Sequence, residues 1–135
     1  MTENERIEKG RAIRREVLGA DYVDQPGAAP TKLQAAFRQF TTENCWGTVW
    51  VREGLSRKQR SMLNLAMLAV MARWHEFEVH VRGALTNGVT EDEIVEILLQ
   101  AGVYAGVPIA SEGFKIADRV IAQYGPKGDH PSRSA

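Results

Sequence analysis

Glu76 and His80 stand four residues apart in a segment that is predicted to be helical. This spacing brings both side chains to one helix face, with their Cβ atoms about 5–6 Å apart. A carboxylate at that distance can hydrogen-bond an imidazole nitrogen, fix its tautomer and raise its pKa. The two groups can also titrate together as one acid–base unit. The pair therefore predicts an acid–base centre; the alternative is an exposed ion pair that contributes roughly a few tenths of a kcal/mol.

Two arginines near this pair are candidates for binding a carboxylated ligand. Arg73 precedes Glu76, and Arg82 follows His80. A guanidinium recognises a carboxylate through its planar fork of donors. Arg73 has no obvious partner nearby in the sequence, whereas Arg82 follows Glu78 by four residues, a spacing that also suits a surface ion pair. Both arginines are predicted to bind substrate, with the surface pair as the alternative for Arg82.

Two tryptophans, Trp46 and Trp50, lie in a stretch that resists a helical interpretation. Residues 44–55 contain Gly47, Gly54 and several β-branched side chains, so we expect a structured loop. Packing in a core or in a subunit interface is the simplest role for the two indole rings. Lining a pocket is a second role, and the two are compatible.

Several other kinds of site are not indicated. Cys45 is the only cysteine and has neither a CxxC partner nor a histidine nearby, so we expect an inert or semi-buried thiol. The three histidines lack metal-ligand spacing, and there is no phosphate loop or dinucleotide fingerprint, so we expect no metal and no cofactor. Acidic and basic residues balance at 17 each, and neither nucleic acid nor a membrane is an expected partner.

The elements that position these residues are predicted to be about six helices, which makes the fold all-α. Thr-x-x-Glu capping boxes begin two of them, and no segment alternates with a period of two for long. Residues 21–29 are expected to be a loop. The helices are expected from Thr2 to about Leu18, from Thr31 to Glu43, from Ser56 to about Met71, from Glu76 to Asn87, from Thr90 to the breakers Gly102, Gly106 and Pro108, and from Ala110 to Tyr124.

The helix that begins at Ser56 is apolar almost all round, so it is predicted to be the central helix, buried on every side. Its apolar run, Met62 to Met71, is far shorter than the ~20 residues of a membrane span. The polar N-terminus does not resemble a signal peptide, and we expect a soluble, cytoplasmic protein. Residues 1–125 are predicted to form a single domain, and the polar residues 126–135 a disordered tail.

Five segments spaced over residues from about 5 to 125 form a specific combination, although each segment alone is not specific. They are Gly10–Gly19 (GRAIRREVLG), Cys45–Leu55 (CWGTVWVREGL), Arg60–Ser61, His75–Arg82 (HEFEVHVR) and Asn87–Thr90 (NGVT). Together they resemble the γ-carboxymuconolactone decarboxylase family. The chain departs from the family at Glu53, where proline is usual, and at Ala105, where many relatives carry cysteine.

The resemblance implies an alkylhydroperoxidase-like helical fold that assembles as a homo-oligomer, commonly a hexamer. It also implies cofactor-free decarboxylation of γ-carboxymuconolactone to β-ketoadipate enol-lactone, in the protocatechuate branch of aromatic catabolism. Peroxidases of the same superfamily use a CxxC motif whose second cysteine stands four residues before a histidine. This chain has Glu76 there, so peroxidase chemistry is excluded.

On this basis His80 is expected to donate a proton or to stabilise an oxyanion, and Glu76 to orient it. Arg73 and Arg82 are expected to bind the substrate carboxylates, while Trp46 and Trp50 shape the pocket. Two alternatives stay open. One is a related enzyme acting on a different lactone or β-keto acid, and the other is a non-catalytic, oligomeric binding member of the family.

Overall fold

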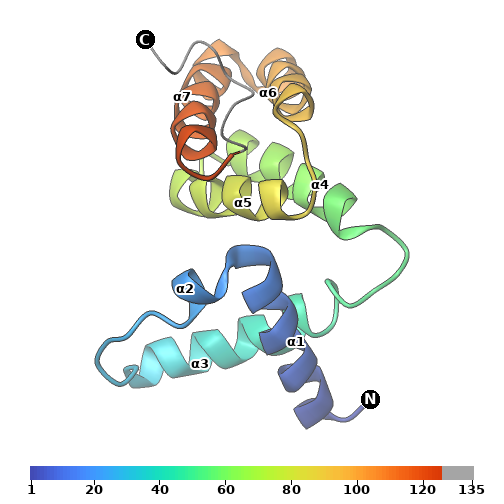
Figure 1. The fold of residues 1–135 in the computed structure, drawn as a ribbon, viewed down its shortest axis with the longest axis vertical. Coiled ribbons are helices and arrows are strands. Elements are labelled where there is room, and N and C mark those ends of the chain that lie inside the picture. The colour runs from blue at the N-terminus through green and yellow to red at the C-terminus, as the bar shows by residue number, and fades with distance from the viewer. Residues whose placement is uncertain (126–135) are drawn as a thin grey trace. The chain divides into compact units, whose positions relative to one another are not determined.

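The structure, a computed structural model, describes residues 1–125, and every regular element in this part of the chain is a helix (Figure 1). The all-α prediction is confirmed, although seven α-helices form within residues 1–125 where about six were expected. Contacts divide the chain into two compact units, Met1–Arg57 and Lys58–Ala135. The single domain expected over residues 1–125 stays a prediction. The tail predicted for residues 126–135 lies outside the described residues.

The first unit begins with α1 (Glu3–Leu18), which starts and ends where the sequence predicts. The Thr2 hydroxyl accepts a hydrogen bond from the Glu5 N–H at 3.2 Å, and the Glu5 carboxylate accepts one from the Thr2 N–H at 2.6 Å. Gly19 ends the helix with φ at +94°, a conformation that glycine adopts without steric cost. Both ends of α1 are therefore set by local sequence.

A short helix, α2 (Ala20–Val23), follows directly. The prediction of a loop was wrong for this single turn. The Val23 N–H donates to the Gly19 carbonyl at 3.0 Å, and the Asp24 N–H donates to the Ala20 carbonyl at 2.8 Å. No apolar periodicity marks so short a helix, because one turn is too brief to show a pattern.

The next helix, α3 (Lys32–Thr41), lies within the helix predicted from Thr31 to Glu43, and Thr31 is its N-cap. It continues into η1 (Thr42–Trp46), a turn of π-helix. The loop prediction was therefore wrong for residues 44–46, and the turns begin at Gly47. A π-helical turn inserts one extra residue into the helical hydrogen-bond pattern, which hides it from a search for a regular period.

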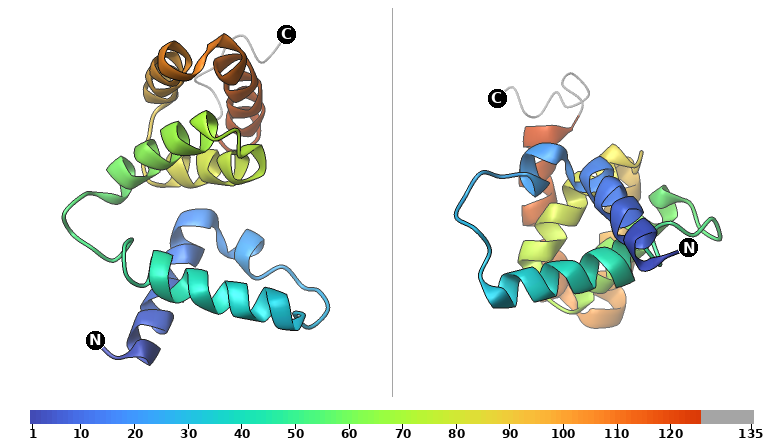
Figure 2. Two further views of the ribbon diagram at one scale, coloured as in Figure 1. Left: turned by 180° about the vertical axis from the view of Figure 1, so that it is seen from behind. Right: turned by 90° about the horizontal axis from the view of Figure 1, so that it is seen from below.

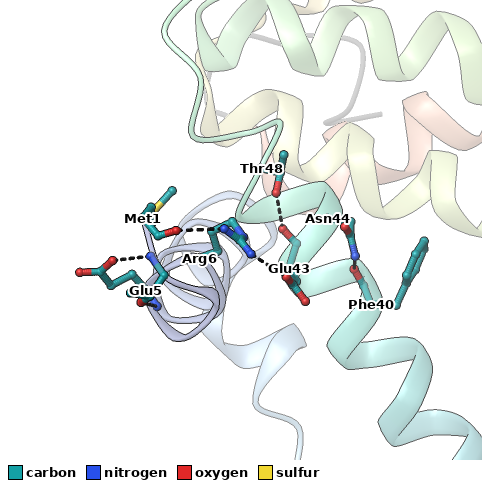
Figure 3. Close-up of polar contacts among 8 residues, drawn as sticks. Met1, Glu5, Arg6, Phe40, Glu43, Asn44 and Thr48 are labelled. Atoms are coloured by element: carbon teal, nitrogen blue, oxygen red, sulfur yellow. Dashed lines mark hydrogen bonds and ion pairs between the residues drawn. The ribbon is translucent and has the colours of Figure 1, made fainter.

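α1 packs closely against η1 where two glycines lie. A Cβ atom at Gly10 would overlap the carbonyl oxygen of Thr42, and a Cβ atom at Gly47 would overlap the carbonyl oxygen of Arg6. The Arg6 guanidinium also binds the Glu43 carboxylate at 3.1 Å (Figure 3). The two glycines therefore allow a backbone-to-backbone contact, which one ion pair reinforces.

The second unit contains α4 (Arg57–Val70) from Lys58 onward, together with α5 (Trp74–Thr86), α6 (Glu91–Ala105) and α7 (Val107–Tyr124). α4 and α5 form one antiparallel hairpin, and α6 and α7 form a second (Figures 1 and 2). α7 packs against both α5 and α6. The core contains side chains from all four helices, including Leu65, Phe77, Val81, Ile94, Leu98, Ile116 and Val120.

One side of α4 is open. Ser61, Leu65 and Ala69 are buried, and they lie on the side that faces the core. The prediction that this helix is buried on every side was wrong for the single chain, because the helices of its own unit cover only one of its faces. The four large apolar side chains elsewhere on the helix and just beyond it are 49–59% exposed: Leu63, Met67, Val70 and Met71.

The last helix begins earlier than predicted, at Val107 instead of Ala110. Gly106, with φ at +113°, ends α6, and Pro108 falls in the first turn of α7. Proline fits there because the first N–H groups of a helix have no intrahelical acceptor. None of the helices in the described part of the chain is long and apolar enough to cross a membrane.

Candidate active site

His80 lies on α5 where this helix meets α4. Its Nδ1 atom is 3.4 Å from the side-chain nitrogen of Asn64 on α4. The imidazole is half-buried, and loss of hydration lowers the pKa of His80 to about 4, while the nearby Glu76 carboxylate acts in the opposite direction. His80 is therefore a neutral imidazole at pH 7.

The sign of this shift differs from the sequence expectation. Glu76 does act to raise the pKa of His80, as the four-residue spacing predicts. Its side chain is exposed, so water screens its charge, and the loss of hydration around the imidazole is the larger effect. The expectation of a raised pKa was wrong, because burial by the packing of α4 on α5 cannot be read from the spacing of two residues.

Asn64 is the candidate functional residue that the sequence interpretation missed. It is the only polar residue between Met62 and Met71, and the only sign of it in the sequence is that it interrupts this apolar run. Buried or half-buried polar groups nearly always have hydrogen-bonding partners, and here the partner is His80. With the amide nitrogen donating to Nδ1, the ring proton is on Nε2, because a neutral imidazole carries a single N–H.

Arg73 lies on the same side of α5 as His80. The two residues are seven positions apart, which is close to two helical turns. Arg73 occupies the N-cap position of α5 and is exposed, and its side chain forms no ion pair with any residue between 1 and 125. The structure thus brings Glu76 and His80 together. Arg73, Glu76 and His80 form a row along one side of α5, and Arg73 lies at its N-terminal end.

Arg82 lies elsewhere on the helix. It follows His80 by two residues and therefore points to the opposite side of α5. Its guanidinium lies over the Tyr124 ring, 4.5 Å from the centroid, at the edge of a groove of about 1010 Å³. Glu78 pairs instead with Arg119 at 3.3 Å. Arg82 is thus separated from the His80 row, and its contact with Tyr124 is one that the sequence did not indicate.

The tryptophans belong to the first unit, and His80 belongs to the second. Trp46 and Trp50 are both buried, and their rings stack with centroids 4.8 Å apart and planes at 28°. This is the core packing that was expected as their simplest role. Their predicted contribution to a substrate pocket stays a prediction.

Residues 35–119 match the Carboxymuconolactone decarboxylase family. The chain belongs to this family. The matched stretch contains all of the candidate site residues discussed above: Trp46, Trp50, Asn64, Arg73, Glu76, His80 and Arg82.

Two relatives are similar in sequence to this chain over almost its whole length. The chain is 40% identical over 124 residues to the nitrosuccinic acid decarboxylase npaB of Metarhizium robertsii, covering 92% of this chain and 87% of that protein. It is 34% identical over 125 residues to the 4-carboxymuconolactone decarboxylase of Acinetobacter baylyi, covering 93% of each. An uncharacterised 15.0 kDa protein of Paracoccus denitrificans is 32% identical over 97 residues, covering 70% of this chain and 72% of that one.

The described residues give little support for thiol or metal chemistry. Cys45 is exposed, and a partial loss of hydration of its thiol raises the pKa of Cys45, against a smaller opposite effect of a hydrogen bond with Trp50. A raised pKa keeps the reactive thiolate scarce near neutral pH, as expected for an inert thiol. Among residues 1–125, no three His, Cys, Asp or Glu side chains gather in a way that could hold a metal ion. The arrangement in this family member therefore favours hydrogen-bond and acid–base chemistry at His80.

Proposed function

We propose that the protein is a cofactor-free decarboxylase of small activated dicarboxylates, with γ-carboxymuconolactone as substrate and β-ketoadipate enol-lactone as product. The observation that carries the proposal is the half-buried, neutral imidazole of His80, which contacts Asn64 and lies next to Glu76. The names of the two relatives that match 92% and 93% of the chain support the reaction class, because both are decarboxylases.

The substrate supplies its own electron sink. Cleavage of the bond between the ring carbon and its carboxylate releases CO2 and leaves the electron pair on the ring carbon. That pair delocalises through the C=C bond onto the lactone carbonyl oxygen, which gives a furanolate-like dienolate. Such chemistry does not require an organic electron sink such as pyridoxal or thiamine. The protein has to bind the carboxylates, stabilise the oxyanion and provide a proton for the ring carbon.

A neutral His80 suits the stabilisation of the oxyanion. Its Nε2–H is oriented before the reaction starts, and preorganised donors aimed at developing charge usually make the largest catalytic contribution. Decarboxylation also consumes one proton, which comes from solvent over a full cycle. Glu76 is exposed and adjacent, so we assign the transfer of this proton to the Glu76/His80 pair, with an effect of about 10²–10⁴-fold.

Arg73 is our main candidate for binding the carboxylate that the product retains. It lies in the same row as Glu76 and His80, and no ion pair within residues 1–125 competes for it. Arg82 is a weaker candidate for a carboxylate ligand, because it lies on the opposite side of α5 against Tyr124.

Nitrosuccinate is the second candidate substrate, and the 40% identity to the nitrosuccinic acid decarboxylase favours it. Its nitro group can accept the electron pair that departing CO2 leaves, as the lactone carbonyl does in γ-carboxymuconolactone. In nitrosuccinate the departing carboxylate is on the carbon that carries the nitro group, and in γ-carboxymuconolactone it is on a carbon linked through a C=C bond to the lactone carbonyl. Both products keep a second carboxylate. The same His80 donor could therefore serve either oxyanion.

The test is turnover of the purified protein on each compound without added cofactor, followed by ultraviolet absorbance and CO2 release. We expect faster turnover of γ-carboxymuconolactone, and a loss of roughly 10²-fold or more in His80→Ala. His75→Ala, which changes an exposed histidine of the same helix, is the matched control. Preference for nitrosuccinate would select the second candidate. Equal rates in wild type and His80→Ala would remove His80 from the mechanism.

The proposal includes a homo-oligomer. The exposed apolar side chains of α4, such as Leu63 and Met67, support it, because an oligomer can cover them. Light scattering during size-exclusion chromatography measures the assembly, and a monomer would contradict it. A folded oligomer that turns over neither compound would point to a different lactone or β-keto acid, or to a non-catalytic binding role.

A further inference from the structure

We infer that the first unit contains a binding site for a small polycarboxylate, in a groove lined by Arg11, Arg14 and Arg38. The groove has a volume of about 460 Å³ and is lined by residues of α1, α3 and the segment between them, and by Thr42 of η1. None of these residues takes part in the proposed reaction. The inference goes beyond the proposed function, and it can be tested by binding alone.

The positive charge of this groove is largely uncompensated. Arg11 and Arg14 stand one turn apart on α1, and Arg38 comes from α3. Arg11 pairs only loosely with the exposed Glu8, at 3.6 Å, and such surface pairs contribute little. Within residues 1–125, neither Arg14 nor Arg38 forms an ion pair.

A single carboxylate, that of Asp24, lines the groove, and it is already engaged. Both Nε and a terminal nitrogen of Arg15 bind its Oδ2 atom, at 2.8 and 2.7 Å. Arg15 itself does not line the groove. Asp24 is therefore neutralised from outside, and it leaves the charge of the three lining arginines available to a ligand.

The remaining walls indicate which anion fits. Ile7, Val23 and Ala35 add apolar side chains to the lining, and Gln39 adds an uncharged polar group. Guanidinium forks match carboxylates in geometry, and the apolar lining side chains suit a carbon skeleton between the carboxylates. The volume of about 460 Å³ is in the range of sites for small organic molecules. A short organic acid with two or three carboxylates fits this description better than a single inorganic anion.

Calorimetric titration of the full chain with citrate at pH 7.5 and low ionic strength tests the inference. We expect one site per chain, with an affinity that falls as salt is added. Arg14→Gln and Arg38→Gln should each weaken binding by roughly tenfold, because each removes one charged fork. Arg119→Gln is the matched control, since this exposed arginine pairs with Glu78 outside the groove, and it should bind as the wild type does.

Three results would overturn the inference. The first is the absence of citrate binding at millimolar concentration, and the second is undiminished binding by both groove variants. The third is equally tight binding of inorganic phosphate, which would mean that charge alone is recognised. Circular dichroism of each variant checks the fold, and Arg38→Lys, which keeps the charge and loses the fork, gives a second measure should Arg38→Gln unfold. Citrate affinity equal to the wild type in Arg38→Lys would also contradict recognition by the fork.

Discussion

The side-chain amide of Asn64 lies 3.4 Å from Nδ1 of His80 and links the middle of α4 to the middle of α5. Because the imidazole is neutral near pH 7, this contact decides which ring nitrogen carries the proton. A donor on Nδ1 leaves the proton of the neutral ring on Nε2.

Asn64→Ala is expected to lower kcat by roughly tenfold or more with little change in KM, because the ring loses its fixed tautomer. Long-range proton–nitrogen NMR spectra of the labelled imidazole measure the tautomer directly, and the wild type should show Nε2–H at pH 7. Gln100→Ala removes an exposed amide from α6 and serves as the control. A wild-type spectrum with the proton on Nδ1 would contradict the assignment, whatever the activity.

The stability of the fold should depend on the protonation of His80. Its pKa is lowered from 6.5 to about 4, so the unfolded chain takes up a proton below pH 6.5 while the folded chain does not until about pH 4. This contribution to the free energy of unfolding is complete above pH 6.5 and is lost as the pH falls toward 4. The loss between pH 7.5 and pH 5 amounts to roughly 2 kcal/mol.

Urea unfolding at pH 7.5 and pH 5 measures this loss. His80→Gln should lose less stability between the two pH values than the wild type, by roughly 2 kcal/mol. His75→Gln, at an exposed position of the same helix, should behave as the wild type. Identical losses in His80→Gln and wild type would show that His80 titrates alike in both states.

Substitutions of Arg73 and Arg82 should differ in whether they change KM or the free energy of unfolding. Arg73→Ala is expected to raise KM by roughly tenfold with a smaller change in kcat, because it removes a ligand of the retained carboxylate. Arg82→Ala is expected to leave KM unchanged and to lower the free energy of unfolding by about 0.5–1 kcal/mol, since it removes the contact with the Tyr124 ring. Steady-state kinetics and urea unfolding of both variants separate the roles, and a raised KM in Arg82→Ala would reverse them.

The close approach of α1 to η1 predicts a strong effect of one methyl group. Gly10→Ala and Gly47→Ala should each destabilise the chain by about 2 kcal/mol or more, because the new Cβ atom would overlap a backbone carbonyl oxygen. Gly54→Ala is the control, since no atom lies within 4 Å of its added Cβ, and it should stay within about 0.5 kcal/mol of wild type. Thermal melting measures the three variants, and a wild-type melting temperature for Gly10→Ala would contradict the packing of α1 on η1.

Features that depend on neighbouring residues in the chain could be predicted from the sequence. The cap at Thr2 and the row of Glu76 and His80 follow from short spacings. Features that depend on tertiary packing could not. The π-helical turn η1 forms where α1 presses against it, and the neutral state of His80 comes from burial between α4 and α5. The role of Asn64 belongs to the same class, because its partner is 16 residues away on another helix.

Three of the seven α-helices in the described part of the chain, α1, α3 and α6, begin with the same reciprocal pair of hydrogen bonds between a threonine and the residue three positions later. These bonds close over very short stretches of chain, and local contacts of this kind form within about microseconds. The long-range contacts, such as α1 with η1 and α5 with α7, need the closure of longer loops and form more slowly. We therefore expect the first turn of each of these helices to form before the helices pack against one another.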